Sequence, residues 1–167
     1  MICLPLEQIN RAAPYKIKGL QDGSVFFTTD NSLHYIVSFD PDDVSLSHIC
    51  YQLVIVNVDN LPSPRDIKLR DTIIAIVEGF FASNNEVMLY ICETGDGKQA
   101  MRNRLFQYWY SFYERKQNFT FLSASIKDEE GVINYATLII RNDNPNYTDV
   151  VNEFALSIKV LNDKPKE

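Results

Sequence analysis

Apolar and polar side chains alternate clearly in the first third of the chain. Between residues 33 and 39, every second side chain is apolar and shares one face, while His34 and Ser38 lie on the other. This period of two predicts a strand with one face on the core and one partly in water. Segments 15–20, 25–28 and 50–58 predict three more strands. Short turns at 21–24, 29–32 and 40–43 indicate an antiparallel meander.

The first strong helical pattern follows this meander. Ser63 is the expected N-cap and Pro64 the first helical residue, with Asp66 completing a capping box. Gly79 interrupts the apolar stripe and indicates a close approach of the helix to the sheet. The residues expected on this stripe are Ile67, Ile73, Ile74, Val77, Phe80 and Phe81.

The segment Val87–Cys92 is the centre of the predicted fold. Its six uncharged residues predict a strand that is buried on both faces. A loop at 93–98, a helix from about 99 to 116 and a hairpin of 119–126 with 132–141 follow. Asn144 and Pro145 are expected to open a last helix as N-cap and first residue. Its expected core side is Val150, Val151, Phe154, Ile158 and Leu161.

The predicted order is therefore roughly β-β-β-β-α-β-α-β-β-α. It favours an α+β fold with a mainly antiparallel sheet and helices packed on it. A chain of 167 residues suits one domain. We expect an irregular lead-in at 1–14, with room for one short turn, and a frayed tail at 162–167.

Composition and charge argue against several classes of function. The net charge of −6 opposes nucleic-acid binding, and no apolar segment reaches the ~20 residues of a membrane span. The N-terminal residues lack the features of a secretory signal. Three widely spaced cysteines favour a reducing, cytoplasmic setting without a disulfide or zinc site. We expect no cofactor.

Several short segments together resemble an uncharacterised bacterial domain family of unknown function, found largely in Bacteroidetes. The resemblance implies a small bacterial cytosolic protein and supplies no activity, ligand or catalytic residue. The segments that carry it are Phe27–Asp30, Tyr35–Val37, Asp71–Ile74, Phe80–Phe81, Tyr90–Cys92, Asp96, Gln99, Arg102, Leu105–Phe106, Trp109 and Asn144–Tyr147.

The loop after the central strand is the candidate ligand site. Loop amides and a helix N-terminus converge at such a position, and Lys98 and Arg102 lie one helical turn apart. With Glu93 and Asp96 they could hold a small anion or a nucleotide. In the alternative interpretation, Asp96 caps the helix and the basic residues pair with the acids. Acid-base catalysis by Glu93 and Asp96 is a weaker hypothesis because nothing indicates that either is buried.

Two further hypotheses involve other residues. A nucleophilic pair of Cys92 with His34 is open, although a cysteine on a buried strand is usually inert. The helix after the loop is rich in aromatic residues, and Tyr110 and Tyr113 lie off its main apolar stripe. These two tyrosines are candidates for a contact with a partner protein or a second subunit, or they are buried in the fold. Stacking of nucleic-acid bases on these aromatic residues is the weakest hypothesis, because the chain has a net negative charge.

The leading functional hypothesis is a non-enzymatic binding or interaction module, possibly regulatory. The alternative is a small-molecule enzyme or a nucleotide- or anion-binding protein that uses Glu93, Asp96, Lys98 and Arg102. A pocket at the loop, with a carboxylate of perturbed pKa, would favour the alternative. A flat apolar patch would favour the interaction module.

Overall fold

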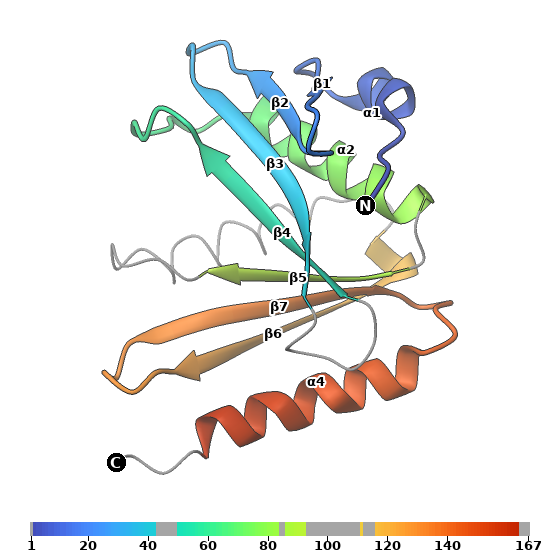
Figure 1. The fold of residues 1–167 in the computed structure, drawn as a ribbon, viewed down its shortest axis with the longest axis vertical. Coiled ribbons are helices and arrows are strands. Elements are labelled where there is room, and N and C mark those ends of the chain that lie inside the picture. Colours follow the sequence, from blue (N-terminus) through green and yellow to red (C-terminus); the bar gives the residue numbers. More distant parts are fainter. Residues whose placement is uncertain (1, 43–49, 84–85, 93–110, 112–115, 164–167) are drawn as a thin grey trace. The chain divides into compact units, whose positions relative to one another are not determined.

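A seven-stranded sheet carries the helices of this protein (Figure 1). The computed structural model describes residues 2–42, 50–83, 86–92, 111 and 116–163. The strands follow the order β1-β2-β3-β4-β5-β7-β6 in a mostly antiparallel sheet, which confirms the predicted α+β class. The elements are α1 (Leu6–Ala12), β1 (Lys18–Gly19), β2 (Val25–Thr28), β3 (His34–Pro41), β4 (Cys50–Asn57), α2 (Ile67–Ser83), β5 (Val87–Cys92), η1 (Lys116–Asn118), β6 (Phe119–Lys127), β7 (Ile133–Arg141) and α4 (Tyr147–Asn162).

The chain divides into two compact units. The first contains Met1–Asp40 and Leu53–Asn85, and the second contains Pro41–Gln52 and Glu86–Glu167. Strand β4 runs from the second unit into the first, so its two ends belong to different units.

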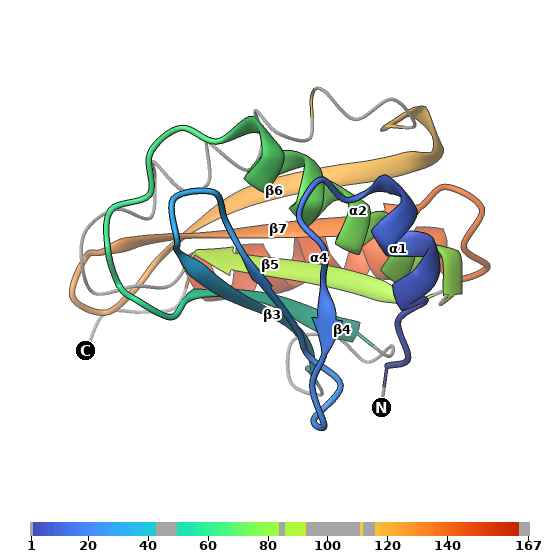
Figure 2. The same ribbon diagram turned by 90° about the horizontal axis from the view of Figure 1, so that it is seen from above.

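In the first unit, strands β2 and β3 turn their odd-numbered side chains toward α2. The rings of Tyr15, Phe27 and Tyr35 form a continuous stack, with centroids 6.1 and 5.5 Å apart. Further along β3, Phe39 stacks on Phe80 of α2 at 4.5 Å. Helices α1 and α2 lie on one side of these strands (Figures 1 and 2). We call the side that faces α2 the inner face and the opposite side the outer face.

Gly79 is the point of closest contact between α1 and α2. A Cβ atom at this position would lie 2.6 Å from Cδ1 of Ile9 and closer still to Cγ1. Ile9 itself is only 1% exposed, so it cannot move aside into solvent. The predicted close approach at Gly79 is confirmed, but its neighbour is α1 rather than the sheet.

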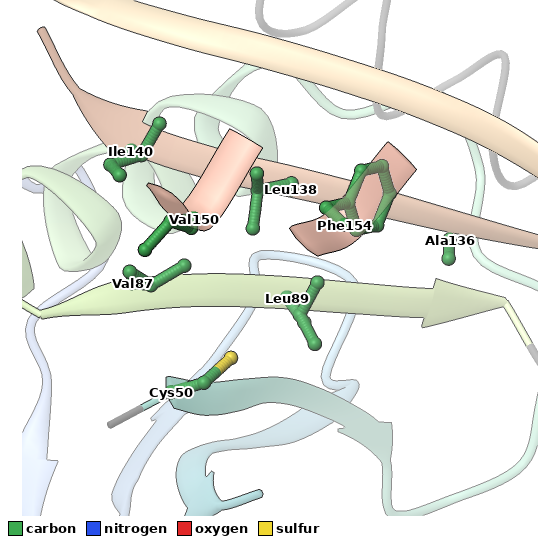
Figure 3. Packing of buried hydrophobic residues seen from close by; sticks show 8 residues of the cluster. All are labelled: Cys50, Val87, Leu89, Ala136, Leu138, Ile140, Val150 and Phe154. Carbon is green, nitrogen blue, oxygen red and sulfur yellow. The ribbon is translucent and has the colours of Figure 1, made fainter. Parts of the chain in front are cut away.

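In the second unit, α4 packs on one face of β6 and β7. The register between β5 and β7 places Leu89 opposite Leu138, and β7 continues into the hairpin with β6. Figure 3 shows the resulting apolar cluster between the strands and α4. Its buried members are Cys50, Val87, Leu89, Ala136, Leu138, Ile140, Val150 and Phe154.

The prediction that Val87–Cys92 lies inside the sheet is confirmed. Strand β5 stands between β4 and β7 in the strand order. Val87, Met88 and Leu89 are 2%, 0% and 2% exposed, so successive side chains are buried on both faces of the strand.

Both long helices begin later than the sequence suggests. In α2 the Leu69 amide donates to Oδ1 of Asp66, so Asp66 caps the helix and the Ser63 assignment was wrong. Before α4, Oδ1 of the buried Asn144 accepts from the Asn146 amide. This turn precedes a helix that starts at Tyr147, so Asn144 is not its N-cap.

Two residues expected in the core are exposed. Ile67 stands at the first position of α2 and is 56% exposed, and Leu161 near the end of α4 is 43% exposed. The lead-in at 1–14 also differs from expectation, because residues 6–12 form the two-turn helix α1. The strand expected at 15–20 is reduced to Lys18–Gly19.

Candidate functional site

The site residues predicted from the sequence lie outside the described part of the chain. The range 93–115, of which only Ser111 is described, contains the candidate ligand residues Glu93, Asp96, Lys98 and Arg102 and the candidate contact residues Tyr110 and Tyr113. The anion-site and aromatic-contact hypotheses therefore stay predictions.

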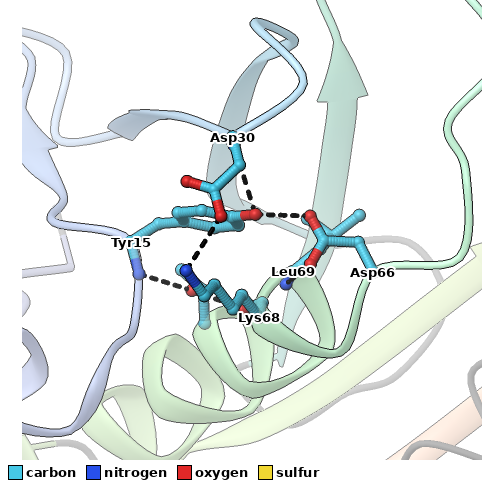
Figure 4. Close-up of polar contacts among 6 residues, drawn as sticks. Tyr15, Asp30, Asp66, Lys68 and Leu69 are labelled. Carbon is cyan, nitrogen blue, oxygen red and sulfur yellow. Dashed lines mark hydrogen bonds and ion pairs between the residues drawn. The ribbon is translucent and has the colours of Figure 1, made fainter.

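The densest polar cluster of the first unit surrounds Tyr15 (Figure 4). The Tyr15 hydroxyl donates to Oδ2 of Asp66 at 2.6 Å and accepts from the Asp30 amide at 3.2 Å. Nζ of Lys68 donates to the Asp30 carboxylate at 2.8 Å. The Tyr15 amide donates to Oγ1 of Thr72, which itself donates to the Lys68 carbonyl. The cluster thus joins the segment after α1, the β2–β3 turn and the first turn of α2.

Burial and the neighbouring acid make Tyr15 a weak acid. Its side chain is 6% exposed, and burial, followed by the hydrogen bond to Asp66, raises its pKa to about 12. The phenol is therefore neutral throughout the physiological range and acts as a hydrogen-bond donor.

This cluster has the geometry of a structural clamp. Both carboxylate oxygens of Asp66 are occupied, one by the Leu69 amide and one by the Tyr15 hydroxyl. The Asp66 carboxylate thereby fixes the start of α2 against Tyr15. The Lys68–Asp30 ion pair is more than half exposed, so solvent screens it and it adds little to the clamp.

Removing the Tyr15 hydroxyl should loosen the clamp. We expect Tyr15→Phe to lower the free energy of unfolding by about 1.5–3 kcal/mol, because a partly buried carboxylate loses its donor. Denaturant titrations at neutral pH measure this loss. Tyr35→Phe, which keeps the same ring stack, is the matched control and should cost less.

The same variant tests the raised pKa. The folded state holds the Tyr15 proton more tightly than the unfolded chain does. The stability that the protonated Tyr15 gives to the folded state is therefore complete below about pH 10 and is lost as the pH rises toward 12. Wild-type stability should therefore fall more steeply over that interval than that of Tyr15→Phe. Parallel profiles for the two proteins would contradict the assignment.

A second polar pair stands at the end of β3. Nδ1 of His34 lies 2.9 Å from Oδ2 of Asp59, and the His34 amide donates to the same oxygen at 2.7 Å. The backbone donation from His34, followed by the ring contact, lowers the pKa of Asp59. Asp59 is therefore a fixed negative charge at neutral pH. The His34 ring also stacks on Phe26, with centroids 5.8 Å apart.

His34 and Phe26 belong to the outer face of the first unit. The β2–β3 register places Phe26 beside Ile36 and Thr28 beside His34. The Val58 amide donates to the His34 carbonyl at 2.8 Å, which aligns Val58 with His34. In an antiparallel pair the next outward-facing residues are two positions away on each strand, so Val56 lies beside Ile36 and Val54 beside Ser38.

We call the apolar residues of this face the outer patch: Phe26, Ile36, Val54, Val56 and Val58. Val56 and Val58 are 44% and 51% exposed, and the other three are half-buried. Val37, an inner-face residue of the neighbouring strand β3, is by contrast 0% exposed. The outer patch is thus an uncharged surface bounded by Asp59 at one end.

The two cysteines whose side chains are described lie in different surroundings. Cys3 is exposed, and Cys50 is buried in the cluster of the second unit. Burial, followed by the charge of Asp42, raises the pKa of Cys50 to about 12, so its thiol stays protonated. The side chain of Cys92 is outside the description, and His34 has Asp59 as its ring partner.

Within the described ranges, no three His, Cys, Asp or Glu side chains are grouped as ligands for a metal ion. Of the helices that the structure describes, none combines the length and apolar character needed to cross a membrane.

Sequence reasoning located the outer face only in part. The alternation at 33–39 placed His34 and Ser38 on the wetter side, and the burial of Leu33, Tyr35 and Val37 confirms this. The run Leu53–Val56 is uniformly apolar and carries no alternation, so it does not show which side chains point outward. The pairing with β3 supplies that information.

Comparison with protein families gives a match over the middle and later parts of the chain. A model described as a family of unknown function, DUF6169, matches residues 65–156, which is more than half of the chain. Comparison with curated proteins and with solved structures finds no match. The matched range begins two residues before α2 and includes α2, β5, β6 and β7 and the first part of α4. The chain therefore belongs to the DUF6169 family, whose function is unknown.

Proposed function

We propose that this protein is a non-enzymatic interaction module and that the outer patch is its docking surface. The observation that carries the proposal is the exposure of Val56 and Val58 beside Ile36, on a sheet face whose opposite side is covered by α2. Contiguous exposed apolar groups are costly for a protein that works alone, and they characterise binding surfaces.

The polar clusters support a binding role over catalysis. Catalytic acids and bases need a free lone pair or proton directed at a substrate. In the Tyr15 cluster both Asp66 oxygens accept hydrogen bonds from the protein itself, and the hydroxyl of Tyr15 is both donor and acceptor. These groups hold segments of the first unit together.

Replacing the exposed valines should not affect folding. Val56→Thr and Val58→Thr preserve shape and strand preference while exchanging a methyl group for a hydroxyl group in each residue. On an open surface we expect the double variant to change the free energy of unfolding by no more than about 0.5 kcal/mol. It should also bind less of the hydrophobic dye ANS than the wild type.

The matched control is Val37→Thr on the inner face. Val37 is fully buried, so its hydroxyl lacks water and the variant should lose about 1–3 kcal/mol. A loss of that size in the Val56→Thr, Val58→Thr variant would show that the outer patch belongs to the core. The proposal would then be wrong.

Other expectations remain proposals alongside this one. They are self-association through Tyr110 and Tyr113, binding of a small anion at Glu93, Asp96, Lys98 and Arg102, a regulatory role, a cytoplasmic location and a bacterial source. None has support from the described residues. The family membership is consistent with each of them and selects none.

A further inference from the structure

We infer that the outer patch docks a basic amphipathic helix of a partner protein. This inference rests on the proposed function and adds the shape and charge of the partner. It is carried by the width of the patch and by the acidic groups at its two ends.

The width of the patch suits one helix. The patch spans three adjacent strands, β2, β3 and β4, whose spacing of about 4.8 Å makes it roughly 10 Å wide. A helix with its side chains is about 10–12 Å in diameter, so a single helix covers the three strands. The exposed pair Val56 and Val58 would contact its apolar stripe.

The charges are arranged along the strands. Asp59 follows Val58 at one end, where the His34 amide and ring hold its carboxylate in place. At the other end, Asp40 has the outward-facing, even-numbered position two residues beyond Ser38 on β3 and is exposed. Lys18 on the short strand β1 stands beside Phe26, at the lateral margin of the patch. The two ends are therefore acidic, and the basic group is at the side.

The distance between the acidic ends sets the length of the helix. Asp40 lies six positions after His34, the neighbour of Asp59. Along an extended strand this separation is about 20 Å. A helix rises about 1.5 Å per residue, so basic side chains roughly 13 positions apart would meet both ends. Apolar residues at intervals of three and four would lie between them. The chain's net charge of −6 adds long-range attraction for such a partner and repels a second copy of itself.

A set of three designed helical peptides tests the inference. Each has the same apolar stripe, and they carry two lysines, two glutamines or two glutamates at each end. We expect the lysine peptide to bind wild-type protein most tightly and the glutamate peptide least, with a difference that shrinks as salt is added. Isothermal titration measures the affinities, and amide shifts in the NMR spectrum map the binding position.

Two variants locate the interaction. Val56→Thr with Val58→Thr should weaken binding of the lysine peptide by about tenfold, because two buried methyl groups are lost. Asp40→Asn should weaken it by about threefold, while Glu129→Gln, the same charge change in the β6–β7 turn, should leave it unchanged. Amide shifts should be concentrated on residues 26, 36, 54, 56 and 58.

The outcomes separate this inference from the proposed function. If the three peptides bind equally and the valine variant weakens all of them, the charge argument is overturned and the docking surface stands. If the protein instead forms a dimer that the valine variant dissociates, the occupant is a second copy. If none of the patch variants changes peptide binding, or if the amide shifts map to other residues, the helix inference is overturned. The ANS-binding and stability measurements then decide whether the proposed function stands.

Discussion

Leu89→Asp should not fold into a stable protein. Leu89 is 2% exposed in β5 and pairs with Leu138 of β7, inside the apolar cluster covered by α4. A carboxylate at this position has no cation among the members of the cluster, and burying an unpaired charge costs several kcal/mol. A loss of that size removes most of the 5–15 kcal/mol by which domains are typically stable.

The matched control is Leu156→Asp. Leu156 lies on α4 and is 62% exposed, so the same substitution meets water there and should cost little. Soluble yield and thermal melting, followed by circular dichroism, compare the two variants. A soluble Leu89→Asp protein with a wild-type melting temperature would show that β5 is not inside the sheet.

Gly79→Leu should be the second most damaging single change. Even a Cβ atom would come within 2.6 Å of Cδ1 of Ile9, and a leucine adds three more carbon atoms in a contact that is already closed. The helix propensity of leucine is better than that of glycine by about 1 kcal/mol, but the overpacking costs more. We therefore expect the free energy of unfolding to fall by about 3 kcal/mol. Denaturant titration measures it.

Two further variants test whether the contact with Ile9 causes this loss of stability. Ala82→Leu places the same side chain at an exposed position of α2 and should be nearly neutral. Ile9→Ala removes the group in the way, so the Ile9→Ala, Gly79→Ala double variant should lose less than the sum of its two single variants. Strict additivity would mean that α1 does not contact α2 at Gly79.

Much of the fold could be predicted because local patterns and tertiary contacts agree. The predicted turn at 21–24 and the predicted hairpin of 119–126 with 132–141 both form, and Gly23 and Gly131 in their turns have positive φ. Helix α1 was missed because seven residues give too short a period to recognise, and its stability comes from packing Ile9 against α2.

The N-termini of the helices show a different limit of prediction from sequence. Ser63 and Asp66 are both good capping residues, and the sequence alone ranked the first one above the second. The choice is made by Tyr15, whose hydroxyl holds Asp66 from 51 positions away. The outer patch was predictable only as a partly wet face around His34, because the positions of Val54 and Val56 depend on pairing with β3.

The most direct test of the account is the solvent exposure of the valine methyl groups in the intact protein. A soluble paramagnetic agent broadens the NMR signals of methyl groups that it can approach. We predict strong broadening for Val56 and Val58, weaker broadening for Val54, and none for the inner-face residues Val25 and Val37, which are 1% and 0% exposed. Protection of Val56 and Val58 equal to that of Val37 would mean that the outer patch is covered within the chain itself, which contradicts its role as a docking surface.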